Sequence, residues 1–93
     1  MSNSPDREAE HILSVFAELL ALPTADGQRK RAKGKVFWQV DPGHEEALDR
    51  HLLRWATGER KDPDSGAHPL VHVAWRALAL VAQEEHRGEP GWL

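Results

Sequence analysis

Two helical patterns on either side of a short acidic loop constrain the fold of this chain more than any other feature. The first pattern spaces its apolar side chains four and three residues apart, at Leu48, Leu52 and Trp55. A second, broader apolar pattern begins at Pro69. The loop between them, residues 59–67, contains Asp-Pro and Asp-Ser-Gly, which are typical of turns. The sequence therefore predicts an antiparallel pair of helices over about residues 42–57 and 69–87.

A third amphipathic helix is predicted near the N-terminus, over about residues 4–22. Ser4 and Pro5 suit the N-cap and the first helical position, and apolar side chains then follow at helical spacing. Pro23 is expected to end this helix, because a proline in a helix interior removes a backbone hydrogen bond. We interpret residues 23–41 as a basic linker followed by a short extended segment.

The length of the chain limits how it can be stabilised. Its 93 residues form one domain at most, and a chain this short buries only about 60–65% of the surface that its unfolded form exposes. It has no cysteine, so neither a disulfide nor a thiolate zinc site can contribute. We therefore predict a single all-α domain over residues 1–93, a small bundle of three helices that oligomerisation completes. Residues 1–3 and 88–93 are expected to be tails.

Charge is unevenly distributed along the chain. The formal net charge is −3, yet residues 28–35 carry five basic side chains between two acidic parts. A protein that binds nucleic acid is usually basic over a whole face, so nucleic acid is not the expected partner. The polar, acidic N-terminus does not have the pattern of a signal peptide, and no apolar run reaches the roughly 18 residues of a membrane span. These features favour a cytoplasmic protein without a membrane partner.

Residue types that carry chemistry gather around the acidic loop, where the predicted helix pair brings the end of one helix near the start of the next. Carboxylates and imidazoles bind divalent ions: Mg²⁺ or Mn²⁺ where oxygen dominates, and Zn²⁺ where imidazole dominates. The candidate metal ligands are His51, Glu59, Asp62, His68 and His72. Glu59 and Asp62 are also the candidate catalytic residues. Each has an ordinary alternative, since a histidine can be a polar core residue and Asp62 a turn former.

Pro69 limits the part that His68 can play in such a site. A residue before proline is pushed out of the helical region of backbone conformation. We therefore expect His68 at or before the N-cap of the last helix, where it does not form a simple helical pair with His72.

Arg50, Lys33 and Lys35 are the candidate phosphate-binding residues, because arginine and lysine side chains donate to phosphate oxygens. A metal bound nearby would polarise a phosphate and activate water. The basic run also has an ordinary interpretation as solvated charge. No aromatic side chains are interleaved with its bases, so stacking on single-stranded nucleic acid is not indicated.

The combined sequence of the helix pair carries a family resemblance. RHL-x-x-W-x-x-GE-x-x-DPDSG followed by H-x-x-x-HVAWRALAL resembles the N-terminal domain of phage-type dATP/dGTP diphosphohydrolases, over about residues 38–83. That domain is similar to the MazG-type all-α nucleoside triphosphate pyrophosphohydrolases. The resemblance implies a helical fold, a dimer or tetramer, magnesium dependence, and hydrolysis of a (deoxy)nucleoside triphosphate to the monophosphate and pyrophosphate.

This chain departs from the MazG pattern in its acidic residues. MazG enzymes place Glu-x-x-Glu on one helix and Glu-x-x-Asp on another, whereas this chain has only Glu46-x-x-Asp49 and no acid on the last helix before Glu84. Three functions therefore stay open. The first is metal-dependent hydrolysis of a nucleotide substrate. The second is a non-catalytic helical module of the same fold that binds a nucleotide or a protein. The third is a structural dimer in which His51 and His72 are polar core residues.

Overall fold

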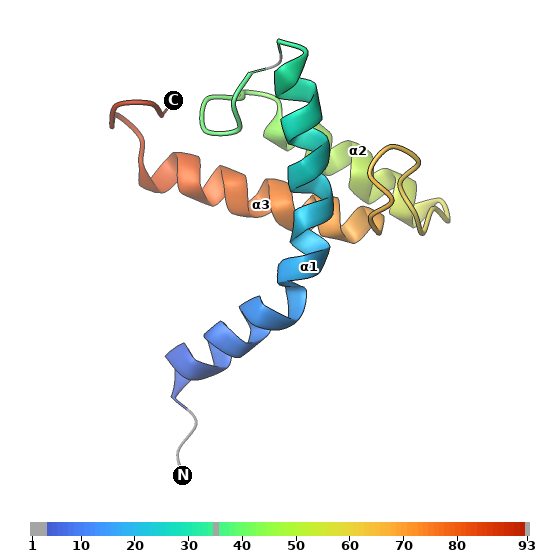
Figure 1. Ribbon diagram of the computed structural model, residues 1–93, viewed down its shortest axis with the longest axis horizontal. Helices are drawn as coiled ribbons and strands as arrows, with labels where there is room; N and C mark the ends of the chain where they lie inside the picture. Colours follow the sequence, from blue (N-terminus) through green and yellow to red (C-terminus); the bar gives the residue numbers. More distant parts are fainter. Residues whose placement is uncertain (1–3, 35, 93) are drawn as a thin grey trace.

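A computed structural model describes residues 4–34 and 36–92 of the chain. Over these residues it consists of three helices, α1 (Pro5–Ala32), α2 (His44–Ala56) and α3 (Pro69–Glu85), and no strand. Figure 1 shows α2 and α3 side by side and antiparallel, with the second half of α1 crossing them. The all-α, three-helix architecture predicted from the sequence is confirmed, while oligomerisation stays a prediction.

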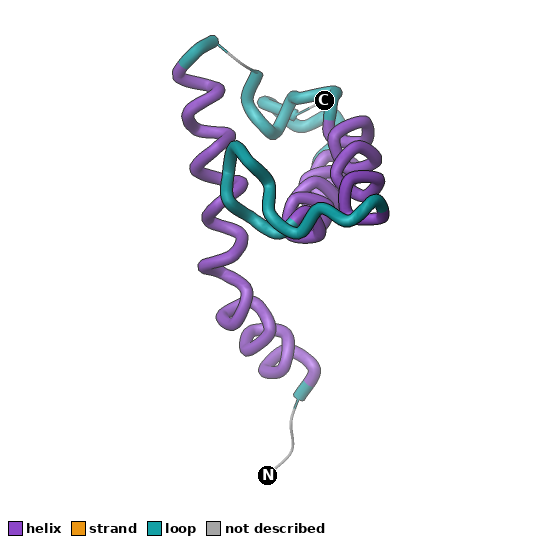
Figure 2. Tube along the Cα trace, turned by 90° about the vertical axis from the view of Figure 1, so that its right-hand side faces the viewer, coloured by secondary structure: helices purple, strands orange, loops and turns teal. Residues whose placement is uncertain are grey.

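The predicted end of the first helix at residue 22 is wrong, and so is the linker that was expected to follow it. α1 continues through Pro23 to Ala32. Proline removes only the hydrogen bond to the Leu19 carbonyl, which weakens one turn and favours a bend without stopping the helix. Beyond it, Asp26 forms ion pairs with Arg29 and Lys30, three and four residues on, which support a helical backbone. Figures 1 and 2 show α1 bent, with its first half projecting away from α2 and α3.

The segment between α1 and α2 forms turns, so the short extended segment predicted there is also wrong. The Val40 N–H donates to the Phe37 carbonyl over 3.1 Å. α2 then begins at His44 and not at residue 42, because the Asp41 carboxylate accepts from the Gly43 N–H at 2.8 Å and holds a turn ahead of the helix. α2 ends at Ala56 and α3 at Glu85, within one or two residues of the predicted ends.

The interface between α2 and α3 is lined by polar side chains. On α2 the buried positions are His44, Ala47 and His51, which share one helix face. Opposite them on α3 lie His72, Ala79 and Gln83. Among the described residues the buried hydrophobic side chains are three alanines. The helix pair therefore encloses polar groups and directs its larger apolar side chains outward.

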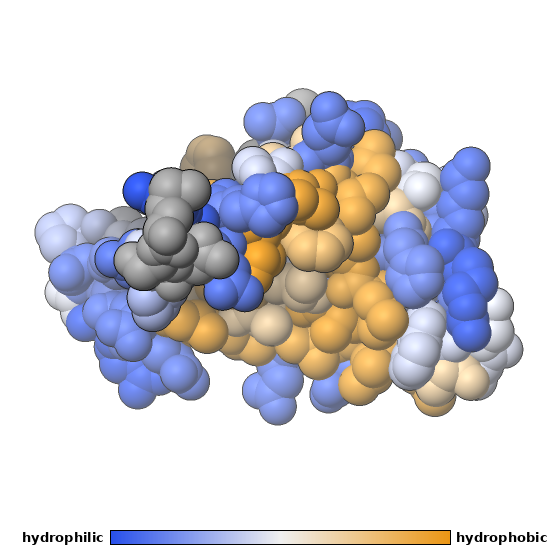
Figure 3. All heavy atoms as spheres, turned by 90° about the horizontal axis from the view of Figure 1, so that it is seen from below, coloured by the Kyte–Doolittle hydropathy of each residue, from blue (hydrophilic) through white to orange (hydrophobic). Residues whose placement is uncertain are grey.

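Large apolar side chains are correspondingly exposed. On α1 they are Ile12, Leu13, Val15, Phe16, Leu19 and Leu22, with exposed fractions of 38–61%. Figure 3 shows an extensive apolar area on one face of the molecule. The radius of gyration, 14.7 Å, exceeds the roughly 12 Å of a compact domain of this length. Over the residues described, none of the helices has a stretch long and apolar enough to cross a membrane.

Two side chains of α3 attach the rest of the chain to the helix pair. The Gln83 amide lies 2.9–3.2 Å from the backbone carbonyls of Trp38, Gln39 and Asp41, and so fixes the turn before α2. The Trp75 indole N–H donates to the Thr24 hydroxyl at 3.0 Å and links α3 to α1. The first set of bonds fixes the turn near the C-terminal end of α3, and the second fixes α1 across its middle.

We predict that Gln83→Leu lowers the free energy of unfolding by about 1–3 kcal/mol, because it leaves buried carbonyl groups without donors. Urea denaturation followed by circular dichroism measures the change. Glu84→Leu, at the adjacent exposed position, is the control and is expected to have a small effect. Equal stability of the two variants would contradict a structural role for the Gln83 amide.

Candidate functional site

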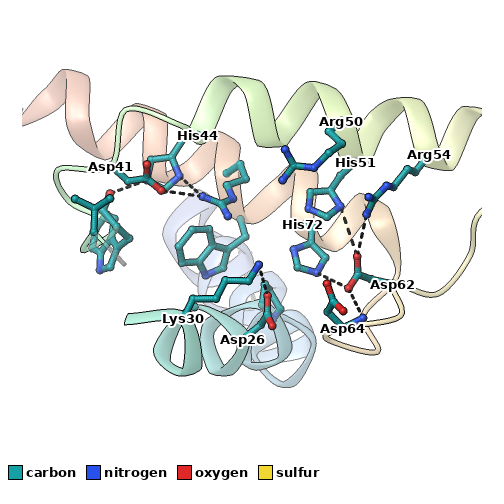
Figure 4. Close-up of a pocket in the computed structure, with 16 residues that line it drawn as sticks. Asp26, Lys30, Asp41, His44, Arg50, His51, Arg54, Asp62, Asp64 and His72 are labelled. Carbon is teal, nitrogen blue, oxygen red and sulfur yellow. Dashed lines mark hydrogen bonds and ion pairs between the residues drawn. The ribbon is translucent and has the colours of Figure 1, made fainter. Parts of the chain in front are cut away.

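A cavity of about 380 Å³ lies between the second half of α1 and the α2–α3 pair. Its volume is in the range of small-molecule binding sites. The lining combines imidazoles, carboxylates, lysine and arginine side chains and two indoles, contributed by all three helices and by the loop between α2 and α3. Figure 4 shows how the charged and imidazole side chains lie around it.

Three of the predicted metal ligands meet at one end of this cavity. His51 from α2, Asp62 from the loop and His72 from α3 are buried, and each offers one ligand atom within 4.8 Å of the others. The two imidazole rings stack with centroids 4.2 Å apart and planes 11° from parallel. Two imidazole nitrogens and one carboxylate oxygen are a donor set that divalent transition ions accept. The His51–Asp62–His72 group is therefore a possible metal-binding site.

The loop sequence itself fixes the Asp62 carboxylate. Oδ1 accepts from the backbone N–H groups of Asp64 and Ser65, both at 2.9 Å, and from the Ser65 hydroxyl. The chain then turns through Gly66, whose φ of +77° is a conformation that side chains disfavour. Oδ2 takes no part in the turn and lies 3.9 Å from His51 Nδ1 and 3.6 Å from Arg54 Nη1. One carboxylate oxygen thus holds the loop and the other faces the histidines.

Hydrogen bonds also set the charge of Asp62. Burial alone would raise its pKa, but the N–H groups of Ser65 and Asp64 and the nearby His72 outweigh burial and hold the pKa below its ordinary value. Asp62 is therefore ionised at neutral pH.

His51 is held in its neutral form. Burial, followed by the neighbouring His72, lowers the pKa of His51 to about 4, although the charge of Asp62 opposes the shift. Its Nδ1 is buried and has no hydrogen-bond partner. A buried nitrogen without a partner is unfavourable unless something binds it, and a neutral imidazole is the form that coordinates a metal. His51 therefore has the two properties of a metal ligand, a nitrogen without a hydrogen-bond partner and a neutral ring.

His72 is connected to the same loop. Its Nε2 lies 2.6 Å from the Ser65 hydroxyl and 4.0 Å from Asp62 Oδ1. Burial lowers the pKa of His72, while Asp62 and Asp26 oppose the shift. At neutral pH the His51–Asp62–His72 group therefore combines two neutral imidazoles with one negative charge, which suits a divalent cation.

A second buried polar cluster borders the cavity on the side away from these three residues (Figure 4). His44 Nε2 donates to the Trp38 carbonyl at 2.6 Å, so Nδ1 is the acceptor for Arg76 Nη1 at 2.8 Å. Arg76 also pairs with Asp41 at 3.4 Å, and its Nε is buried without a partner. This cluster fixes a guanidinium in the cavity wall.

The other sequence candidates for the metal site do not belong to this group of three residues. His68 is the N-cap of α3, as expected, and its Nδ1 accepts from the Leu70 N–H at 3.1 Å. Glu59 follows α2, and its Oε1 is buried without a hydrogen-bond partner. Neither residue belongs to the group of mutually close ligand atoms. Sequence proximity to the loop does not bring these two side chains together with His51 and His72.

Only some of the candidate phosphate-binding residues line the cavity. Arg50 lines the cavity, as does Arg54. Lys33 is exposed beyond the end of α1 and does not line it, and Lys35 lies outside the described residues. Lys30 belongs to the same basic run but was not chosen as a site residue from the sequence, and it does line the cavity.

Helical spacing is the signal that would have identified the α1 residues of the lining. Pro23, Asp26, Gly27 and Lys30 follow the i, i+3, i+4, i+7 pattern of one helix face. This pattern continues past the predicted helix end at residue 22, because α1 extends to Ala32.

We predict that acid destabilises the protein between pH 6.5 and 4. The ordinary pKa of His51, 6.5, applies to the unfolded chain, and the folded value is about 4. Between these values the unfolded state binds more protons, so the free energy of unfolding falls as pH falls. The lowered pKa of Asp62 acts in the same direction at the acidic end of this range. Thermal unfolding measured across this range tests it, and His51→Asn should show a shallower pH dependence. A melting temperature that is constant or rises toward pH 5 would contradict the burial of neutral His51.

The segment that contains this site is similar to a known protein family. A family model described as the N-terminal domain of dATP/dGTP diphosphohydrolase matches residues 32–90. No curated protein and no solved structure matches the chain. The matched segment includes α2, the acidic loop and α3, and hence the His51–Asp62–His72 group. Because the match spans more than half of the 93 residues, the protein belongs to the family of dATP/dGTP diphosphohydrolase N-terminal domains.

Proposed function

We propose that this protein hydrolyses a (deoxy)nucleoside triphosphate, with dATP and dGTP as the first candidates, to the monophosphate and pyrophosphate in a metal-dependent reaction. The observation that carries the proposal is the buried His51–Asp62–His72 group, which opens onto a cavity lined by cationic side chains. The family to which the chain belongs supports nucleotide hydrolysis as the class of reaction.

The donor atoms fit a divalent ion. His51 Nδ1, Asp62 Oδ2 and His72 Nε2 would hold it, since the first is buried without a partner and the second takes no part in the loop. Two imidazoles and one carboxylate favour Mn²⁺ or Zn²⁺ over Mg²⁺ as the ion. When bound, the ion supplies Lewis-acid stabilisation of phosphate charge and activation of water.

The remaining side chains act on the substrate. Hydrolysis forms a bond between a water oxygen and the α-phosphorus and breaks the bond from that phosphorus to the bridging oxygen, so that pyrophosphate leaves. Arg50 and Arg54 neutralise the phosphate charge that develops. Trp38 and Trp75, which also line the cavity, offer aromatic surface for the nucleobase. Glu59, the sequence candidate for the base, does not line the cavity, although one of its carboxylate oxygens is buried without a hydrogen-bond partner.

One observation favours a second function, a non-catalytic nucleotide-binding module. The only Glu-x-x-Asp pair ahead of the loop is Glu46 and Asp49, and both side chains are exposed and do not line the cavity. Without a second acidic motif, the site would bind a nucleotide and metal but turn over slowly. The two functions differ in whether pyrophosphate is released.

We predict that the purified protein releases pyrophosphate from dATP or dGTP when Mn²⁺, Mg²⁺ or Zn²⁺ is present. Asp62→Asn and His72→Ala are each expected to lower the rate by more than about 100-fold, because changes even to groups that only support metal ligands cost 10–100-fold. A coupled pyrophosphate assay measures the rate. Glu45→Gln, an exposed position outside the cavity, is the matched control.

Two results would decide against hydrolysis. Absence of pyrophosphate across the four common dNTPs with all three metals would remove the enzymatic proposal. If calorimetry then showed metal-dependent nucleotide binding by the same preparation, the binding module would replace it. Binding of neither metal nor nucleotide would favour a structural dimer in which His51 and His72 are polar core residues.

We also propose that a second copy of this chain covers the apolar face of α1, in a dimer or a higher oligomer. Ile12, Phe16 and Leu19 follow helical spacing and are 41–50% exposed. Such a stripe is unfavourable in water, and the chain buries few apolar side chains of its own. Matching stripes on two copies would supply the hydrophobic burial that the polar α2–α3 interface does not.

We predict that Phe16→Asp and Leu19→Asp shift the protein from an oligomer to a monomer, because each places a charge within the contact. Ser14→Asp is the control, since it introduces the same side chain on the opposite face of α1. Light scattering coupled to size-exclusion chromatography measures the mass. A wild-type protein that is monomeric at all accessible concentrations would exclude this contact.

A further inference from the structure

The second half of α1 forms one wall of the cavity, although all but its last residue lies ahead of the family-matched segment 32–90. Most of the described side chains of α1 are exposed, but Pro23 and Asp26 are buried. Asp26 is 8% exposed, which is unusual for a carboxylate on a helix with so few contacts. The burial of Asp26 therefore calls for an explanation.

A directed hydrogen bond between α3 and α1 fixes the orientation of this wall. Trp75 donates its indole N–H to the Thr24 hydroxyl at 3.0 Å. Thr24 lines a second hollow on the other side of α1, together with Leu20 and Gln28. Asp26 and Lys30 face the cavity. The rotation of α1 about its axis is thereby set so that these two charged side chains point inward.

The Asp26 carboxylate forms ion pairs with two basic side chains of α1. Its Oδ2 lies 2.9 Å from Lys30 Nζ and its Oδ1 lies 3.2 Å from Arg29 Nη2. Burial alone would raise the pKa of Asp26, but the pairs with Lys30 and Arg29 outweigh it and keep the pKa below its ordinary value. Solvent-exposed ion pairs of this spacing contribute little to stability, so helix stabilisation alone does not account for the burial of Asp26.

Lys30 has the exposure and direction that a binding residue needs. Its side chain is 49% exposed, so the ammonium keeps donors available beyond Asp26. Figure 4 shows Lys30 reaching into the cavity from the α1 side, while Arg50 and Arg54 approach from α2. Charges on α1 also act on the candidate metal site. Burial is the main cause that lowers the pKa of His72; the charge of Asp26 opposes this shift and the charge of Lys30 adds to it.

We propose that Lys30 is a phosphate-binding residue of the nucleotide site and that Asp26 is the positioning residue that directs it into the cavity. The inference rests on the proposed function, since it names further residues of the same site. A polyphosphate chain in the cavity would then meet cations on both sides, Lys30 from α1 and the two arginines from α2. The first helix would be part of the binding site and not only a scaffold.

The test measures binding of inorganic tripolyphosphate, with Mn²⁺ present, by isothermal titration calorimetry on the full chain. Lys30→Ala is expected to raise the dissociation constant about 10- to 100-fold, the usual value of one charge-assisted contact. Lys33→Ala, which removes the same charge three residues on but outside the cavity, should change it less than about twofold. Lys30→Arg should restore most of the affinity, and Asp26→Asn should lose part of it.

Several outcomes would overturn the inference. It fails if the wild type does not bind tripolyphosphate, or if Lys30→Ala and Lys33→Ala bind equally well. Lys30→Gln, which keeps a donor toward Asp26 without the charge, covers the case in which Lys30→Ala loses helicity by circular dichroism. Lys30→Gln must show the same loss of affinity.

Hydrolysis assays separate this inference from the proposed function. If the wild type binds tripolyphosphate through Lys30 but releases no pyrophosphate from any dNTP, the proposed enzymatic function fails and the binding role of Lys30 stands. If the wild type hydrolyses dNTPs and Lys30→Ala has an unchanged KM, the enzymatic function stands and the role of Lys30 fails. A raised KM with a kcat close to that of the wild type supports both.

Discussion

The carboxylate of Asp62 is the feature on which the arrangement of α2, α3 and their loop depends. A buried charge is stable only when it is paired or hydrogen-bonded. One Asp62 oxygen meets this requirement through the loop, by accepting from the backbone of Asp64 and Ser65. The other oxygen faces His51 and Arg54. The same side chain therefore closes the loop between two helices and presents a negative oxygen to the histidines that those helices contribute.

Placing these polar groups between α2 and α3 determines where the apolar side chains go. Because His44, His51, His72 and Gln83 occupy the facing stripes, Leu52, Leu78 and Val81 are directed outward. The hydrophobic effect then provides little stabilisation within a single chain. The helix pair is held instead by hydrogen bonds to backbone carbonyls and by the Arg76 cluster. A fold organised in this way leaves large apolar side chains exposed on the single chain, because polar side chains occupy the interface between its helices.

The sequence predicted the parts of the structure that local patterns determine. The helical patterns on either side of the loop located α2 and α3, the proline after His68 placed that residue at the N-cap, and the crowding of histidines and acids identified His51, Asp62 and His72. Glu59 was predicted to join them because the helix pair brings the end of α2 near the start of α3. Its side chain is not among the close ligand atoms, because the direction of a side chain after a helix end depends on the loop conformation, which spacing does not reveal.

The end of α1 could not be predicted for a different reason. Proline and Asp-Gly ordinarily favour a helix end, but tertiary contacts offset that preference: Trp75 of α3 bonds to Thr24, and Asp26 is buried against the cavity with Lys30. Neither contact is visible in a local window, since Thr24 and Trp75 are 51 residues apart in sequence. The same misjudged boundary concealed Lys30, because its position on the cavity side follows only from a helix that continues past Pro23.

The bend in α1 gives the two halves of this helix separate environments (Figure 1). The first half carries the exposed apolar stripe, and the second half carries the charged wall of the cavity. In a straight helix, the Trp75–Thr24 bond would fix the direction of the apolar stripe together with that of the cavity wall. The hydrogen bond that Pro23 removes allows the two halves to point in different directions. A partner on the first half would nevertheless restrict the second half through the shared backbone. An oligomer formed through the first half is therefore expected to stabilise the position of the cavity wall that the second half provides.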